Sequence, residues 1–163
     1  METARASLLL AVFSASLVAV PCFGQDAGTT PKEAIQRLAK AAVTAKEPAD
    51  VLRFYDESED LILIESSGHQ HKGYAAVKKE FQKVFREVAI FELEVTEMTA
   101  KQLQDVAWVT CRQRAKFRVL ADDNKFQLEV RTTFVLKRHK DAWRIVLDHS
   151  SPIVDVPRIK PLQ

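Results

Sequence analysis

The spacing of apolar residues in this chain changes once, at Ile90, and this change constrains the fold more than any other feature. Between residues 31 and 88, apart from the short run 61–64, apolar residues recur at the spacing of amphipathic helices. From Ile90 to Ser150 they alternate with polar residues, as in strands buried on one face. The connections between the alternating runs are short, at residues 101–105, 121–125 and 139–141. Helices followed by consecutive antiparallel hairpins are typical of an α+β domain whose helices cover one face of one sheet.

Three helices are expected before the sheet. Residues 30–33 (Thr-Pro-Lys-Glu) have the form of a capping box, which predicts the start of the first helix, and Pro48 follows its end. A short second helix is expected over residues 49–55, and a longer amphipathic helix after Gly73. The apolar run 61–64 predicts a buried strand between them.

The first 24 residues read as a secretory leader. Arg5 lies near the amino terminus, residues 8–20 are small and apolar, and Gly24 precedes a polar stretch, which matches the three regions of a signal peptide. The apolar run is shorter than the roughly 20 residues that a spanning helix needs. We therefore expect a secreted or periplasmic protein with no integral membrane segment after cleavage. The expected organisation is a signal peptide at 1–24, a linker at 25–30, one domain at 31–152 and a tail at 153–163.

Composition and charge exclude some classes of protein. The chain is 47% hydrophobic and 28% charged, as in ordinary soluble globular proteins, and its net charge of +2 gives no reason to expect nucleic acid as a partner. A basic stripe does occur in one predicted strand, at Arg112, Arg114, Lys116 and Arg118. Glu92, Glu94 and Glu129 are expected on the same face, where cross-strand pairs would neutralise the stripe. We predict a ladder of ion pairs or a dimer face.

Cysteine usage predicts a fold held by packing. If Cys22 leaves with the leader, Cys111 is the only cysteine of the mature chain, and no intramolecular disulfide can form. A lone cysteine in a strand is most often a small buried residue, and we expect this of Cys111.

The order of elements and three short motifs resemble the nuclear transport factor 2-like (NTF2-like) superfamily, in its SnoaL-like branch. The motifs are Phe54-Tyr55-Asp56 before a buried strand, Gly68 to Gly73 before a helix, and the closing run 143–151. That closing run is also similar to the end of the association domain of calcium/calmodulin-dependent kinases, although Leu147 replaces its first histidine and Ser150 its arginine.

This resemblance implies a cone-shaped α+β fold in which three N-terminal helices pack on a curved, mainly antiparallel sheet. It also implies a hydrophobic pocket between sheet and helices, and a homodimer formed through the outer sheet face. The superfamily includes isomerases, dehydratases, cyclases and simple binding or assembly modules, so the fold leaves the function open.

The closing strand supplies the sharpest candidate for chemistry. Strict alternation places Trp143, Ile145, Leu147 and His149 on one face and Asp148 on the other. His149 is therefore predicted to face the pocket, where an imidazole could bind a ligand or transfer a proton near neutral pH. The alternative is a buried histidine whose ring nitrogens are satisfied by neighbouring groups.

The sequence offers weaker candidates for ligand-binding and metal-binding residues. Tyr55 and Trp143 could line a pocket for an apolar or aromatic ligand, or could simply fill the core. His69 and His71 share a face if the segment is extended, as a metal pair would need, but no spacing identifies the remaining ligands. We therefore predict an exposed polar loop there, with no metal and no cofactor.

Taken together, the sequence predicts a secreted SnoaL-like protein that binds a small, largely apolar ligand in a cone-shaped pocket as a homodimer. One alternative is a cofactor-free acid/base enzyme, an isomerase, dehydratase or hydrolase that uses His149. The other is an assembly module with a filled core. The predicted inward faces contain almost no Asp or Glu, which disfavours the enzyme.

Overall fold

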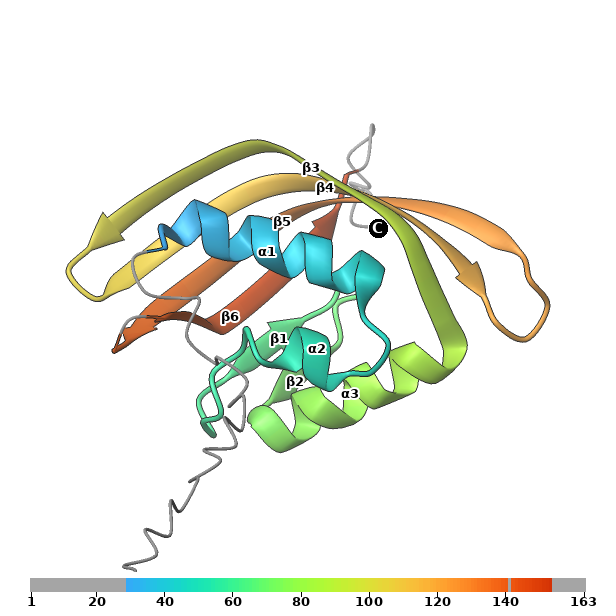
Figure 1. Cartoon of the computed structure of the whole chain (residues 1–163), viewed down its shortest axis with the longest axis horizontal. Helices are drawn as coiled ribbons and strands as arrows, with labels where there is room; N and C mark the ends of the chain where they lie inside the picture. Colours follow the sequence, from blue (N-terminus) through green and yellow to red (C-terminus); the bar gives the residue numbers. More distant parts are fainter. Residues whose placement is uncertain (1–28, 141, 154–163) are drawn as a thin grey trace, which may run out of the picture.

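The computed structural model describes residues 29–140 and 142–153, so the predicted signal peptide and nearly all of the predicted tail lie outside the described residues. The predicted α+β architecture is confirmed, with three helices and one six-stranded sheet (Figure 1). The elements are α1 (Pro31–Thr44), α2 (Ala49–Leu52), β1 (Ile62–Ile64), β2 (Gln70–Lys72), α3 (Tyr74–Glu87), β3 (Val88–Leu103), β4 (Val106–Val119), β5 (Lys125–His139) and β6 (Ala142–Pro152). None of the described helices is long and apolar enough to cross a membrane.

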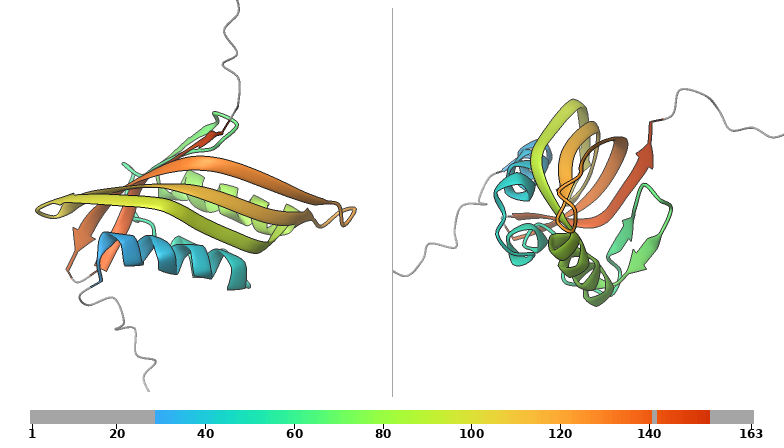
Figure 2. Two further views of the ribbon diagram at one scale, coloured as in Figure 1. Left: turned by 90° about the horizontal axis from the view of Figure 1, so that it is seen from above. Right: turned by 90° about the vertical axis from the view of Figure 1, so that its right-hand side faces the viewer.

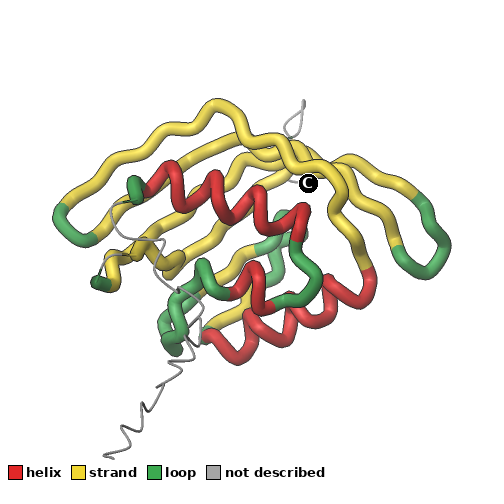
Figure 3. The backbone as a smooth tube through the Cα atoms, in the orientation of Figure 1, coloured by secondary structure: helices red, strands yellow, loops and turns green. Residues whose placement is uncertain are grey.

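The six strands form one curved sheet in the order β2-β1-β6-β5-β4-β3. The long strands β3 to β6 pair as the three predicted antiparallel hairpins, whereas β1 pairs with β6 in parallel. The long strands arch over α1, and α2 and α3 lie on the same side of the sheet (Figures 2 and 3). The space between the arch and the helices is therefore where side chains from both layers meet.

The helix starts follow from local sequence. In α1 the capping box forms as predicted, since the Glu33 amide donates to Thr30 Oγ1 over 3.3 Å and the Thr30 amide donates to Glu33 Oε2 over 2.8 Å. Before α3, Gly73 has φ +82°, and a Cβ there would lie 2.9 Å from Glu59 Oε2. Only glycine fits this turn without strain.

The core lies between the inner sheet face and the helices. Ala107, Val109 and Cys111 of β4 are fully buried, opposite buried side chains of α1 and α2 such as Ile35 and Leu52. Cys111 is thus the small buried residue that the sequence predicted. Burial raises the pKa of its thiol to about 11, which makes it a poor nucleophile near neutral pH.

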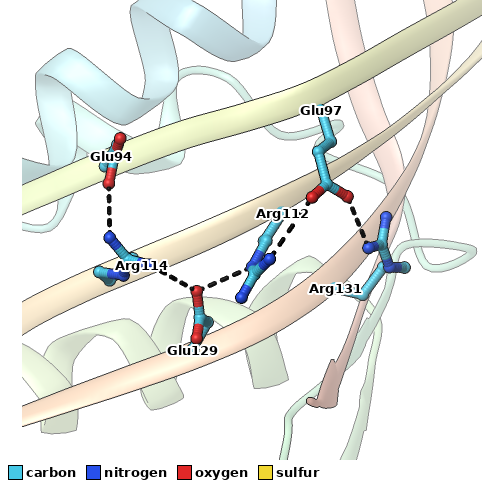
Figure 4. A network of polar contacts seen from close by, with 6 residues as sticks. All are labelled: Glu94, Glu97, Arg112, Arg114, Glu129 and Arg131. Atoms are coloured by element: carbon cyan, nitrogen blue, oxygen red, sulfur yellow. Dashed lines mark hydrogen bonds and ion pairs between the residues drawn. The ribbon is translucent and has the colours of Figure 1, made fainter.

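The outer sheet face carries the predicted ladder of ion pairs (Figure 4). One oxygen of Glu129, Oε1, accepts from Arg112 Nε over 2.8 Å and from Arg114 Nη2 over 3.1 Å. Glu97, at an irregularity in the register of β3, joins Arg112 to Arg131. The hydrogen bond from Arg112 holds the pKa of Glu129 below its usual range. Arg112 and Arg114 of the basic stripe are therefore paired with carboxylates on this face.

A bulge interrupts β6 at Val146. Ile145 pairs with Leu136 of β5, but the next residue of β5 toward its amino end, Val135, pairs with Leu147. Val146 is therefore one residue more than β5 can match, and such an extra residue reverses the faces of all residues that follow it.

The exposure of the side chains follows this reversal. Trp143 and Ile145, before the bulge, are buried as the alternation predicted. Beyond the bulge, Asp148 is buried and His149 is exposed, the opposite of the prediction. Strict alternation is thus correct for β6 up to Ile145 and wrong after it.

Candidate functional site

A cavity of about 360 Å³ lies between the inner sheet face and the helices. This volume falls at the lower end of the range for small-molecule pockets. Most of its lining is apolar and comes from α1, α3 and the long strands. The lining residues include Ile35, Leu38, Ala39, Leu63, Phe81, Val84, Leu93, Ala115, Leu128, Val130 and Phe134. The predicted pocket is therefore present, and the few polar groups in its lining are the candidates for specific contacts with a ligand.

One polar pair is buried in this cavity. The Tyr55 hydroxyl donates a hydrogen bond to Asp148 Oδ2 over 2.7 Å, and both residues line the cavity. Backbone hydrogen bonds hold Tyr55 beside β6, because the Ile145 amide donates to Phe54 O and the Asp56 amide donates to Ile145 O, each over 2.9 Å. The bulge at Val146 then turns Asp148 toward the phenol.

Burial changes the acidity of both members of the pair. Desolvation raises the pKa of Asp148 from 3.8 to about 6, although the hydrogen bond from Tyr55 acts in the opposite direction. Burial, together with the charge of Asp148, raises the pKa of Tyr55 well above 10. Near neutral pH the phenol is therefore a proton-bearing donor, and the carboxyl lies close to its titration point.

A second polar group lies in the cavity wall. His71 Nε2 lies 2.7 Å from Glu65 Oε1 and 4.0 Å from Glu80 Oε2, and both glutamates line the cavity. Burial alone would raise the pKa of Glu65, but hydrogen bonds from His71 and Ser67 hold it below its usual value. With Asp148, these residues place three carboxyl groups in the cavity. The expectation that the inner faces hold almost no Asp or Glu is wrong.

The three site residues predicted from the sequence lie in different places. Tyr55 lines the cavity as predicted. Trp143 is buried outside the lining, and its indole Nε1 donates to Thr29 O over 3.0 Å, so it fills the core instead. His149 is exposed, 3.4 Å from Ser151 Oγ, and the prediction that it faces the cavity as a ligand contact or base is wrong because the bulge turns it outward.

The residues that the sequence reasoning missed had weak signals. Strict alternation predicts Asp148 on the outer face, and no residue type in 143–151 signals the bulge that reverses this. Glu80 lies on α3, where a glutamate is ordinarily a solvated helix residue. Its position opposite β2 depends on the packing of α3, which the local pattern does not specify.

Comparison with solved structures gives the same fold. The chain is similar to a nuclear transport factor 2 (NTF2-like) superfamily protein from Salmonella enterica, with 14% identity, a TM-score of 0.67, and 80% of this chain and 93% of that one covered. It is also similar to a structure from Xanthomonas campestris named for a calcium/calmodulin-dependent protein kinase II association domain, with 19% identity, a TM-score of 0.63, and coverages of 75% and 84%. A third is a ketosteroid isomerase-like protein from Erwinia carotovora, with 20% identity, a TM-score of 0.59, and coverages of 75% and 95%.

The TM-scores establish a shared fold, and at such low identities the similarity leaves the function open. Among curated proteins, none matches this chain significantly. The family model for the SnoaL-like domain matches residues 32–155, which is most of the chain. The predicted resemblance is confirmed, and the chain belongs to the SnoaL-like domain family of the NTF2-like superfamily.

Proposed function

We propose that this protein binds a small, largely apolar molecule in the cavity, with the Asp148–Tyr55 pair as the polar contact for one end of that molecule. The observation that carries the proposal is a buried carboxyl in a cavity whose lining is otherwise mostly apolar. Pockets that bind small molecules combine an apolar lining with a few placed polar groups in this way. An open volume of about 360 Å³ also argues against an assembly module with a filled core.

The binding proposal can be tested by filling the cavity. Ala115 lies on the inner face of β4 and lines the cavity, so Ala115→Phe places a ring in the open space. We expect the affinity for 2-naphthol, a neutral bicyclic phenol, to fall at least about tenfold in this variant, as measured by fluorescence titration. Ala121→Phe adds the same ring at an exposed turn and should bind as the wild type does. Equal binding by all three proteins would contradict the proposal.

A second function is favoured by the acidity of Asp148. A general base is most effective when its pKa lies near the working pH, and a carboxyl with a pKa of about 6 meets this condition. In this reading Asp148 takes the proton from a carbon next to a ligand carbonyl, the carbonyl oxygen becomes an enolate, and Asp148 returns a proton to carbon. Asp148 would thus have the catalytic role that the sequence analysis predicted for His149, and the protein would be a cofactor-free isomerase or dehydratase.

Isotope exchange tests this second function without knowledge of the natural substrate. In D₂O the protein should exchange the acidic C–H protons of 2-tetralone for deuterium, with a rate that rises as pH increases through about 6. Asp148→Asn should slow the exchange by about 10²-fold or more, the usual contribution of a general base. His149→Ala, which changes an exposed histidine, should leave the rate unchanged. If His149→Ala loses the exchange and Asp148→Asn keeps it, Asp148 is not the base.

The homodimer and the secreted location stay predictions. Trp108 supports the dimer, because it is 43% exposed on the outer sheet face, on the same strand face as Arg112, and both residue types are enriched at protein interfaces.

A further inference from the structure

We propose that Glu65, His71 and Glu80 form a binding site for a divalent transition metal of the Zn²⁺ class in the wall of the cavity. One ligand atom from each residue lies within 4.8 Å of the other two. Of the two histidines whose spacing suggested a metal pair, only His71 belongs to this cluster. His71 joins two carboxylates, whereas His69 Nδ1 lies 3.1 Å from Ser67 Oγ in an exposed loop.

Strand β2, helix α3 and the residue that follows β1 bring these side chains together. His71 of β2 pairs with Leu63 of β1, and Glu65 lies two residues beyond Leu63, on the same face of its strand. The Glu65 amide donates to His69 O over 2.9 Å, which closes the hairpin. Glu80 comes from α3, which packs against β2. The hairpin therefore fixes Glu65 and His71 relative to each other, and the packing of α3 adds Glu80.

The hydrogen bonds around the cluster orient the free oxygens. Ser67 Oγ donates to Glu65 Oε2 over 2.9 Å, which leaves Oε1 directed at His71. Lys83 Nζ lies 3.5 Å from Glu80 Oε1, which leaves Oε2 on the side of His71. Each carboxylate is thus held at one oxygen and presents the other to the same imidazole nitrogen. Partners of this kind orient metal ligands in established sites.

The imidazole of His71 can form a hydrogen bond with only one of the two glutamates. His71 Nε2 can carry one proton, and its contact of 2.7 Å with Glu65 Oε1 uses that proton. Glu80 Oε2, at 4.0 Å, is too far away for a hydrogen bond to the same nitrogen. A cation between the three atoms would contact all of them.

The ligand set and the spacing fit a small transition metal. Metal–ligand bonds of roughly 2.0 to 2.2 Å in tetrahedral geometry separate ligand atoms by about 3.4 Å. The separations of 2.7 and 4.0 Å lie on either side of this value, so small side-chain movements would complete the site. One imidazole and two carboxylates leave a fourth position open. Because Glu65 and Glu80 both line the cavity, that position is available to water or to a heteroatom of the bound molecule.

Metal titration of the full chain, first treated with a chelator, tests the site. We expect native mass spectrometry to show one Zn²⁺ per chain, and Co²⁺ held by the imidazole and the two carboxylates to give a visible d–d absorption band. His71→Ala should weaken Zn²⁺ binding by about 100-fold or more and abolish the Co²⁺ band, and Glu80→Gln should weaken binding at least about tenfold. His69→Ala removes the neighbouring histidine outside the cluster and should bind Zn²⁺ as the wild type does.

Two results would overturn the metal site. The first is a folded wild-type protein, verified by circular dichroism, that takes up no Zn²⁺ at millimolar concentration. The second is an equal loss of binding in His69→Ala and His71→Ala, which would assign the metal to the exposed loop. Ala115→Phe should retain Zn²⁺ while losing 2-naphthol, so the metal site and the proposed ligand cavity can fail separately.

Discussion

Asp148→Asn should gain about 2 kcal/mol in free energy of unfolding relative to the wild type when the pH is raised from 4 to 8. In the folded protein the pKa of Asp148 is about 6, above its ordinary 3.8, so the folded state holds this proton more tightly than the unfolded state does. The wild type therefore loses stability as pH rises from 3.8 to about 6, and the loss is complete above that range. The difference between pKa values of about 6 and 3.8 corresponds to about 3 kcal/mol.

Urea denaturation of both proteins at pH 4 and pH 8 measures this effect. The buried amide of the variant has its own cost, but this cost is the same at both pH values and cancels in the comparison. Asp60→Asn, which changes an exposed aspartate in a turn, should follow the wild type at both values. A difference between wild type and Asp148→Asn that stays constant with pH would show that Asp148 does not titrate in this range.

Tyr55→Phe should destabilise the protein by about 2 kcal/mol at pH 8, the usual cost of losing a hydrogen bond to a charged group. The phenol donates to Asp148 Oδ2 over 2.7 Å, and this bond holds the pKa of Asp148 lower than burial alone would. Without it the carboxylate is buried with its hydroxyl donor removed, and its pKa should rise above about 6. At pH 4, where Asp148 is protonated, the loss should be smaller.

The matched control for this prediction is Tyr74→Phe. Tyr74 is half-buried, packs at the edge of the core, and should lose less than about 0.5 kcal/mol. In the double variant with Asp148→Asn, the effect of Tyr55→Phe at pH 8 should shrink, because the charged acceptor is gone. An undiminished effect in the double variant would assign the cost to packing against Phe81, whose ring lies 5.3 Å from that of Tyr55.

Local sequence signals predicted the elements whose partners are close in the chain. The capping box at Thr30 and Glu33 starts α1, and short connections pair β3 to β6 in order. The second helix ends at Leu52, shorter than expected, because the chain from Phe54 to Asp56 instead forms hydrogen bonds with Ile145. That contact, like the parallel pairing of β1 with β6, joins segments about 90 residues apart, and no turn residue signals it.

The site was less predictable than the fold for a physical reason. The sequence leaves Tyr55 either in the pocket lining or in the core, and it is the backbone hydrogen bonds of Phe54 and Asp56 with Ile145 that place it in the lining. Asp148 and His149 lie on the faces opposite to those predicted, because the face of each side chain depends on one unmatched residue, Val146. Glu80 was missed because the side of a helix that meets a short hairpin is decided by tertiary packing, not by periodicity.

The bulge at Val146 also bears on how cavities of this kind can diverge. Consider two chains with the same residues at the end of the closing strand. The chain with the extra residue would present a carboxyl to the bound molecule, and the chain without it would present an imidazole. A deletion of a single codon thus alters the acid–base character of the cavity as much as a substitution does. In alignments of related sequences, the number of residues between the position of Trp143 and the end of the strand therefore carries information that residue identity alone does not.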